Sequence, residues 1–222
     1  MRLVLLGLPG AGKGTQAALL AAVGSVPHVA TGSIFRQAVT LGTPLGRQVQ
    51  AVMEGGGLVP DALTIAIVRD RLAQPDCGAG FVLDGFPRTL AQGEALDATL
   101  LALGRELTRA MHLDIPEAAA LTRLSGRRSC THCGATYHIA ADPPAPGDLC
   151  RRCGYPVVQR ADDAEDAQRQ RILAYRRDTE PLLVYYGRQG KLARVAADRP
   201  MGDVAADLAG IAGLGSGGAS AG

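Results

Sequence analysis

The segment from Gly7 to Thr15 has the residue types and spacing of a phosphate-binding loop. It reads Gly-Leu-Pro-Gly-Ala-Gly-Lys-Gly-Thr, follows an apolar stretch and precedes one rich in alanine and leucine. Glycines let backbone N–H groups turn toward phosphate oxygens, and a following helix adds its positive N-terminal end. Lys13 could then contact the β- and γ-phosphates of a nucleotide. A hydroxyl residue usually follows this lysine directly, whereas here Gly14 intervenes before Thr15. The alternative, a plain glycine-rich turn, fits this strand-to-helix setting poorly.

Asp84 is a candidate for a magnesium site beside that loop. It ends the apolar run Phe81 to Leu83 and precedes a Gly-Phe-Pro turn. An acid in this position commonly faces Mg²⁺, usually through water. An aspartate that only caps a helix or stabilises a turn fits the position equally well.

Four cysteines have the spacing of a structural zinc site. They form two C-x₂-C pairs separated by sixteen residues: Cys130 and Cys133, then Cys150 and Cys153. Each pair can form a tight turn that presents two thiolates, and four thiolates close a tetrahedral coordination shell. The site is therefore predicted to be structural rather than catalytic, with four free thiols in a loop as the alternative.

The residues around the cysteines leave a second interpretation open. Arg151 and Arg152 lie between ligands, and a zinc ribbon can bind nucleic acid. The segment has few aromatic residues for base stacking, and it interrupts the main pattern of the chain instead of lying at a terminus. We therefore expect the zinc to stabilise an insertion. His132 and His138 are expected to be surface or packing residues.

Several arginines could surround a phosphoryl group during transfer, because that transition state carries spread-out negative charge. Arg123 and Arg127 are four apart and are expected on one helix face. No nucleophile–histidine pair accompanies these motifs. Transfer to a sugar hydroxyl would call for a general base, whereas a phosphate acceptor is already ionised at neutral pH. The motifs therefore favour a phosphate acceptor. The candidate arginines are Arg36, Arg88, Arg123, Arg127, Arg160 and Arg171.

The elements that position these residues alternate between strands and helices, which indicates an α/β fold with a parallel sheet. Strands are predicted at 1–7, 81–83, 109–115 and 192–196, with 26–30 as a fifth candidate, and helices at 12–23, 61–74, 90–103, 116–124 and 162–187. Pro116 suits the first turn of its helix, and Asp162 with Glu165 fits a capping box. Residues 31–60 and 127–160 break the alternation as insertions. The tail from Gly213 is expected to be disordered.

Composition excludes several protein classes. The chain has 222 residues, 47% hydrophobic and 20% charged, with a net charge of +2. These values exclude a wholly disordered chain and argue against a general nucleic-acid coat. No signal peptide or membrane span is apparent, so a cytoplasmic protein without a membrane partner is expected. The five cysteines are expected to form no disulfides, and Cys77 is expected to be a small buried or loop residue.

Five segments together resemble the adenylate kinase family: GLPGAGKGT, ATGSIFR, GFVLDGFPRT, the GRR before the cysteines, and QRADD. The similarity runs from about Met1 to Asp207 and extends to the long form whose lid holds a structural zinc. It implies a P-loop nucleoside monophosphate kinase fold, with a five-stranded parallel sheet flanked by helices and two mobile insertions. It also implies Mg²⁺-dependent interconversion of ATP plus AMP with two ADP, which maintains the adenine nucleotide balance, by a monomer.

The resemblance also implies a domain division and site residues. The core would be 1–29, 60–125 and 164–212, the AMP-binding insertion 30–59, the lid 126–163 and the tail 213–222. Catalytic roles would fall to Lys13, Asp84, Arg88, Arg123, Arg127, Arg160 and Arg171. ATP would contact Gly10, Ala11, Gly12, Lys13, Gly14, Thr15, Arg127, Thr136, Tyr137 and the backbone carbonyl of Arg199. AMP would contact Thr31, Arg36, Gly57, Leu58, Val59, Gly85, Phe86, Pro87, Arg88, Arg160 and Arg171, with Gln92 at the adenine edge.

One position departs from the family pattern. The family usually has aspartate where this chain has Ser33. Ser33 could cap the following helix, but it supplies no carboxylate for pairing with the lid, for example with Arg160. A slightly weaker closed state is the expected consequence. Three alternatives remain at this point: a UMP or CMP kinase of the same fold, a nucleic-acid-binding zinc-ribbon ATPase, and a P-loop GTPase switch, for which no guanine-reading motif is visible.

Overall fold

The computed structural model describes residues 1–214 of the chain. Its centre is a five-stranded sheet in the order β2-β3-β1-β4-β8, and all neighbouring strands are parallel. The α/β class with a parallel sheet is therefore confirmed, and each strand lies within two residues of its predicted range. The strands are β1 (Arg2–Leu6), β2 (His28–Ala30), β3 (Phe81–Asp84), β4 (Arg109–Asp114) and β8 (Leu192–Ala196).

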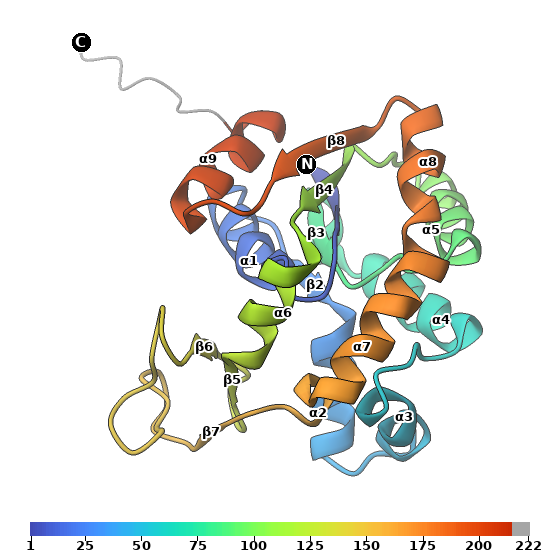
Figure 1. Ribbon diagram of the computed structural model, residues 1–222. Helices are drawn as coiled ribbons and strands as arrows, with labels where there is room; N and C mark the ends of the chain where they lie inside the picture. The colour runs from blue at the N-terminus through green and yellow to red at the C-terminus, as the bar shows by residue number, and fades with distance from the viewer. Residues whose placement is uncertain (215–222) are drawn as a thin grey trace.

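The sheet is the middle of three layers, because its strands are apolar on both faces. In β1, Leu3 and Leu5 join one buried cluster, whereas Val4 and Leu6 join the other. This follows from the two-residue period of a strand. Helices cover both faces, as parallel sheets require (Figure 1). One cluster contains α1 (Lys13–Val23), α6 (Glu117–Ser125) and α9 (Met201–Ile211), and the other contains α4 (Asp61–Leu72), α5 (Leu90–Ala102) and α8 (Pro181–Arg188).

Two insertions have small cores of their own, and the first follows strand β2 whereas the second follows helix α6. The first contains α2 (Thr31–Thr40) and α3 (Pro44–Glu54), which pack around Phe35, Val49 and Val59. The second contains an antiparallel sheet in the order β6-β5-β7. Its strands are β5 (Arg127–Cys130), β6 (Thr136–His138) and β7 (Val157–Val158). Both lie below the main sheet in Figure 1.

The helix predicted over 162–187 is largely present, but it begins later, at Glu165, and a π-helical turn divides it into α7 and α8. A 3₁₀ turn (Ala161–Asp163) precedes α7 (Glu165–Ala174), a π-helical turn (Tyr175–Thr179) follows, and α8 begins at Pro181. Proline has no N–H to donate in a helix, and the chain widens just before it, with Glu180 N donating to Tyr175 O at 2.9 Å. The predicted capping box is wrong, because α7 has Ala164 at its N-cap, with no side-chain hydrogen bond.

Several smaller predictions are also corrected. Pro116 is the N-cap of α6 and lies before its first turn. Helix α6 ends at Ser125, so Arg127 is not on its face with Arg123 but begins β5. Ser33 does not cap α2, because that helix already begins at Thr31.

The predicted tail at 213–222 falls mostly on residues 215–222, which lie outside the described residues. Within the described part, Leu214 N donates to Ala209 O at 2.8 Å, so the chain is still ordered where the tail was expected to begin. Among the helices of residues 1–214, none has the length and apolar character needed to cross a bilayer.

Candidate active site and metal centre

The loop between β1 and α1 adopts a backbone that requires glycine. Gly10 and Gly12 have φ values of +89° and +91°, a region that residues with a Cβ rarely occupy. A Cβ on Gly10 would also lie 2.4 Å from the carbonyl oxygen of Ala120 in α6. The loop therefore packs closely on α6, and its backbone N–H groups precede the N-terminus of α1. This is the arrangement of a phosphate-binding loop.

Lys13 is the first residue of α1, and its side chain folds back over the loop. Its Nζ donates to the carbonyl oxygens of Gly7 at 2.6 Å and Leu8 at 2.9 Å. Burial lowers the pKa of Lys13 to about 7, against the opposing attraction of Asp84. The ammonium is thus held in a partly buried site without an anion to neutralise it fully. A bound phosphate would supply that anion.

Asp84 lies beside the loop, as its sequence position predicted. A Cβ on Gly14 would be 3.2 Å from Asp84 Oδ2, and His28 Nε2 lies 3.8 Å from the same oxygen. Burial raises the pKa of Asp84, whereas the contact with His28 and the positive charge of Lys13 lower it. The second effect is larger, so the pKa of Asp84 lies below its usual value. The carboxylate is therefore charged at neutral pH and next to the predicted phosphate position. It caps none of the helices of residues 1–214, so the helix-cap interpretation is wrong.

A cavity of about 840 Å³ opens over the loop and is lined by the core and both insertions. It is large enough for a nucleotide. The predicted residues that line it are Gly10, Gly12, Lys13, Gly14, Thr15, Arg36, Leu58, Asp84, Gly85, Pro87, Arg88, Arg123, Arg127, Thr136, Tyr137, Arg160 and Arg171. The six predicted arginines, which come from residues 36 to 171 of the chain, therefore meet around one space, and Arg152 also lines it.

These arginines form a cluster with an excess of positive charge. Burial, reinforced by Arg171, lowers the pKa of Arg88 to about 10. Burial, reinforced by Arg127, lowers the pKa of Arg160 to about 9. Arg36 and Arg171 shift in the same direction, again chiefly through burial. The crowding of these guanidinium groups means that anions would stabilise the cluster.

Two carboxylates that partly compensate the cluster were missed as site residues. Asp163 is fully buried and accepts from Arg127 Nε at 2.7 Å and Arg171 Nη1 at 3.0 Å. Asp162 Oδ2 lies 3.0 Å from Arg171 Nη1. Both belong to the QRADD segment, but their partners cannot be read from local spacing.

A second, adjoining cavity lies between the α2–α3 insertion and the sheet edge. The predicted residues that line it are Thr31, Arg36, Gly57, Leu58, Val59, Gly85, Arg88, Gln92 and Arg171. Phe35 and Met53 also line it and were not predicted. Their apolar side chains suit a flat ring, whereas Arg36 and Arg88 suit a phosphate.

Three predicted residues do not line either cavity. Ala11 and Phe86 are each 2% exposed and pack in the two core clusters. The Arg199 side chain donates to Ala196 O at 3.1 Å and pairs with Asp207. Ser33 lines the large cavity and accepts from Arg36 at 3.3 Å, while Arg160 donates to Ser129 and Thr136 of the lid.

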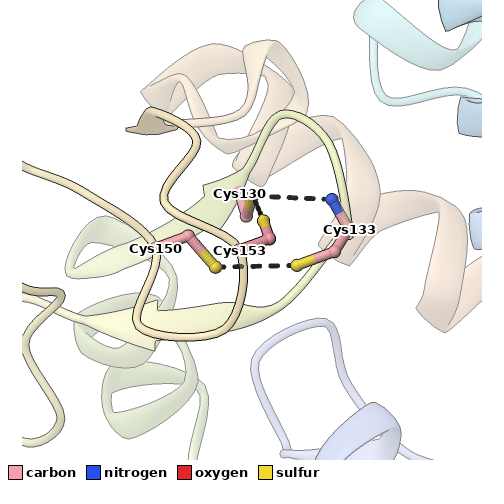
Figure 2. Close-up of side chains that lie close together, drawn as sticks. All are labelled: Cys130, Cys133, Cys150 and Cys153. Atoms are coloured by element: carbon pink, nitrogen blue, oxygen red, sulfur yellow. Dashed lines mark hydrogen bonds between the residues drawn. The ribbon is translucent and has the colours of Figure 1, made fainter.

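The four paired cysteines converge on one point (Figure 2). Their Sγ atoms all lie within 4.8 Å of one another, with 3.5 Å between Cys130 and Cys153 and 3.6 Å between Cys133 and Cys150. Tetrahedral zinc with Zn–S bonds of about 2.3 Å separates its sulfurs by about 3.8 Å. The donor set and spacing therefore fit zinc closely.

The surroundings of the cysteines support the same fit. Backbone N–H groups of His132 and Cys133 point to Cys130 Sγ at 3.4 and 3.5 Å. The Tyr137 hydroxyl lies 3.2 Å from Cys150 Sγ. Such hydrogen bonds stabilise thiolate ligands. Tyr137, predicted only as an ATP contact, thus reaches the metal site as well. His132 instead stacks on Tyr155, with ring centroids 4.2 Å apart.

Comparison with known proteins gives a consistent result. A family model described as adenylate kinase matches residues 5–191. The chain is 51% identical over 195 residues to an adenylate kinase of Moorella thermoacetica, covering 88% of this chain and 90% of the relative. It is 48% identical over 208 residues to an adenylate kinase of Symbiobacterium thermophilum, covering 94% and 96%. It is 46% identical over 213 residues to one of Clostridium acetobutylicum, covering 96% and 99%.

Proposed function

Because the chain belongs to the adenylate kinase family, and is thus a phosphotransferase that acts on nucleoside monophosphates, we propose how its residues divide the reaction. The large cavity binds ATP with Mg²⁺, the adjoining cavity binds AMP, and a phosphoryl group passes between them to give two ADP. The observation that carries this assignment is the cluster of arginines where the two cavities meet: Arg36, Arg88 and Arg171 line both.

On the ATP side, the loop and its lysine bind the phosphates. Backbone N–H groups from Gly10 to Thr15 surround them, and the Lys13 ammonium moves from the loop carbonyls toward the β- and γ-phosphates. Arg123 and Arg127 contact the same phosphates from the lid side. Asp84 would hold Mg²⁺ through water, because its charged carboxylate is beside Gly14. Magnesium, when bound, would neutralise part of the phosphate charge.

On the AMP side, charged residues bind the phosphate and apolar residues bind the adenine ring. Arg36 and Arg88 bind its phosphate, Phe35 and Met53 contact the ring, and Gln92 contacts the adenine edge. The acceptor phosphate oxygen is already ionised, so no general base is needed. Arg160 and Arg171 stabilise the charge on the transferring group.

The two insertions would keep water out of the reaction. Water in the site would accept the phosphoryl group and waste ATP, so closure over both substrates protects the transfer. We assign 30–59 to the AMP-binding insertion, 126–163 to the lid, and 1–29, 60–125 and 164–212 to the core. Separate buried clusters in the two insertions support this division. Zinc bound by the four cysteines would hold the lid together as a unit.

We further infer a cytoplasmic monomer. Cysteines that bind zinc instead of pairing as disulfides are typical of reducing compartments. Both cavities are lined by residues of this one chain, which fits a monomer.

Product analysis by phosphorus NMR tests the proposal. The protein is mixed with ATP, Mg²⁺ and, in separate samples, AMP, GMP, CMP or UMP, with one sample lacking an acceptor. ADP formation with AMP and no free phosphate in the control is the expected result. Transfer mainly to CMP or UMP would overturn the substrate assignment. Free phosphate without an acceptor would contradict the role of the insertions and would call for a test of nucleic-acid binding by the zinc segment.

A further inference from the structure

The side-chain amide of Gln92 has two fixed partners in addition to the cavity that it lines. Gln92 lies in the first turn of α5 and is 2% exposed. Its Oε1 accepts from the backbone N–H of Arg88 at 2.8 Å, and its Nε2 donates to Asp61 Oδ1 at 2.7 Å. One hydrogen-bonding position on each polar atom of the amide is therefore already occupied before any ligand binds.

These partners permit only one orientation of the amide. A carboxylate only accepts hydrogen bonds, and a backbone N–H only donates. Rotating the amide by half a turn would set its oxygen against the Asp61 carboxylate and its NH₂ group against the Arg88 N–H. Both hydrogen bonds would be lost in a buried place, where unpaired polar groups are costly.

Asp61 is itself held firmly by two helices. It is the first residue of α4, and its Oδ2 accepts from Thr89 Oγ1 at 2.8 Å. Thr89 is the N-cap of α5 and accepts from Gln92 N at 3.2 Å. The carboxylate therefore links the first turns of α4 and α5 by hydrogen bonds. It cannot turn away from Gln92 without breaking this link.

The fixed orientation determines what the amide can offer a ligand. Gln92 has one N–H and one carbonyl lone pair left, and no further hydrogen bond of this amide is present within residues 1–214. A 6-aminopurine presents a donor at N6 beside an acceptor at N1, whereas a 6-oxopurine presents an acceptor at O6 beside a donor at N1. An amide that could rotate would pair with either ring, whereas a fixed one pairs with one of them.

We propose that Asp61 is a specificity-determining positioning residue, which selects 6-aminopurine over 6-oxopurine monophosphates by fixing the Gln92 amide. The inference rests on the proposed function, in which this cavity binds the monophosphate. It adds to that function a residue that touches no substrate but decides which purine the substrate carries.

The test compares AMP with IMP, because the two rings differ only at position 6 and in the N1 proton. kcat/KM is measured for each acceptor at saturating Mg·ATP in the wild type and in Asp61→Asn. An asparagine can donate as well as accept, so in Asp61→Asn the rotated Gln92 amide keeps a partner at position 61 and loses only its hydrogen bond from the Arg88 N–H. The variant therefore removes the part of the orientation preference that comes from Asp61 and keeps the part that comes from Arg88. We expect the AMP-to-IMP ratio of kcat/KM to fall by about 10- to 100-fold, the discrimination typical of a bidentate base contact.

Thr89→Val is the matched control. It removes the hydroxyl that contacts the other oxygen of Asp61, together with the α5 cap, but leaves the Asp61–Gln92 hydrogen bond possible. We expect a lower Tm and an unchanged AMP-to-IMP ratio. If Asp61→Asn behaves in the same way, with a lower Tm and an unchanged AMP-to-IMP ratio, then Asp61 only links two helices. That result would overturn the proposal.

A measurement on the wild type covers the case in which the variant fails to fold. Nitrogen-15 NMR of the nucleotide-free protein should show one Gln92 side-chain amide proton protected from exchange and shifted by its carboxylate partner. Two protons that exchange alike with water would overturn the proposal. Because this spectrum needs no turnover, it also separates the two ideas: absence of AMP phosphorylation refutes the proposed function, whereas a freely exchanging amide refutes the role of Asp61.

Discussion

Replacing Asp163 with asparagine should destabilise the nucleotide-free enzyme more than the nucleotide-bound one. Asp163 is fully buried and compensates two arginines, Arg127 and Arg171, that we assign to phosphate binding. Asp163→Asn keeps the shape of the side chain but removes its charge. Two buried guanidinium groups then lose a shared counter-charge, while the hydrogen-bonding frame around them is largely kept.

The size of the stability loss follows from the carboxylate partners that each arginine keeps in the variant. Arg171 still has Asp162 at 3.0 Å, so its loss is partial. Arg127 has no other carboxylate within 4.0 Å among residues 1–214, so it stays charged and mostly buried without a partner. Removing one member of a buried ion pair costs about 3–5 kcal/mol. We expect about 3 kcal/mol for the nucleotide-free protein, or a fall in Tm of about 6–12 °C for a chain of this size.

Bound nucleotide should reverse much of this loss of stability. Phosphates in the large cavity supply negative charge to Arg127, and the variant lacks the carboxylate that competes with them. A ligand stabilises the state that it binds in proportion to its affinity, so an ATP analogue should stabilise the variant more than the wild type. The stability gap between the two proteins should therefore narrow as the analogue concentration rises.

Denaturant unfolding at several concentrations of a non-hydrolysable ATP analogue measures this gap. Asp166→Asn is the control, because Asp166 is an exposed carboxylate on α7, and surface changes of this kind usually alter stability by less than about 0.5 kcal/mol. Our account is refuted if Asp163→Asn matches the control, or if its loss of stability is the same at every analogue concentration.

Three further predictions concern the metal and the phosphate loop. Zinc removal, or Cys130→Ser, should lower Tm more than it lowers kcat at moderate temperature, and lost activity with unchanged Tm would contradict a structural role. Because burial lowers the pKa of Lys13 to about 7, and bound phosphate should raise it, ATP binding at pH 8 should take up a proton and binding at pH 6 should not. Titration calorimetry in buffers of different ionisation enthalpy measures this uptake, and buffer-independent heats at pH 8 would argue against it. Gly12→Ala should cost about 1–2 kcal/mol of stability for its left-handed backbone alone, whereas Gly10→Ala, whose Cβ would also overlap a carbonyl of α6 at 2.4 Å, should cost clearly more in the same unfolding assay.

The sheet and most helices could be predicted from sequence because their signals are local. Apolar runs of strand length alternate with longer alanine- and leucine-rich stretches, and all five main-sheet strands follow those runs. The interruption of the helix after the lid was not predicted, although Pro181 was visible. A proline near a helix start is compatible with a continuous helix or with a break. The choice depends on tertiary contacts, such as Thr179 Oγ1 donating to Arg88 O at 2.8 Å across the site.

The site residues also differ in whether their signal is local in the sequence. Residues predicted from motifs, such as Lys13 and the paired cysteines, would act together with sequence neighbours, so spacing alone identifies them. Asp163 and Asp61 were missed because each acts on a side chain at least 28 positions away, at Arg127, Thr89 or Gln92. Local spacing gives an aspartate at a helix start a sufficient explanation in capping or in the helix dipole. Only the tertiary structure shows that Asp61 contacts Gln92 and that Asp163 contacts Arg127 and Arg171, the side chains that we propose to bind the ligand.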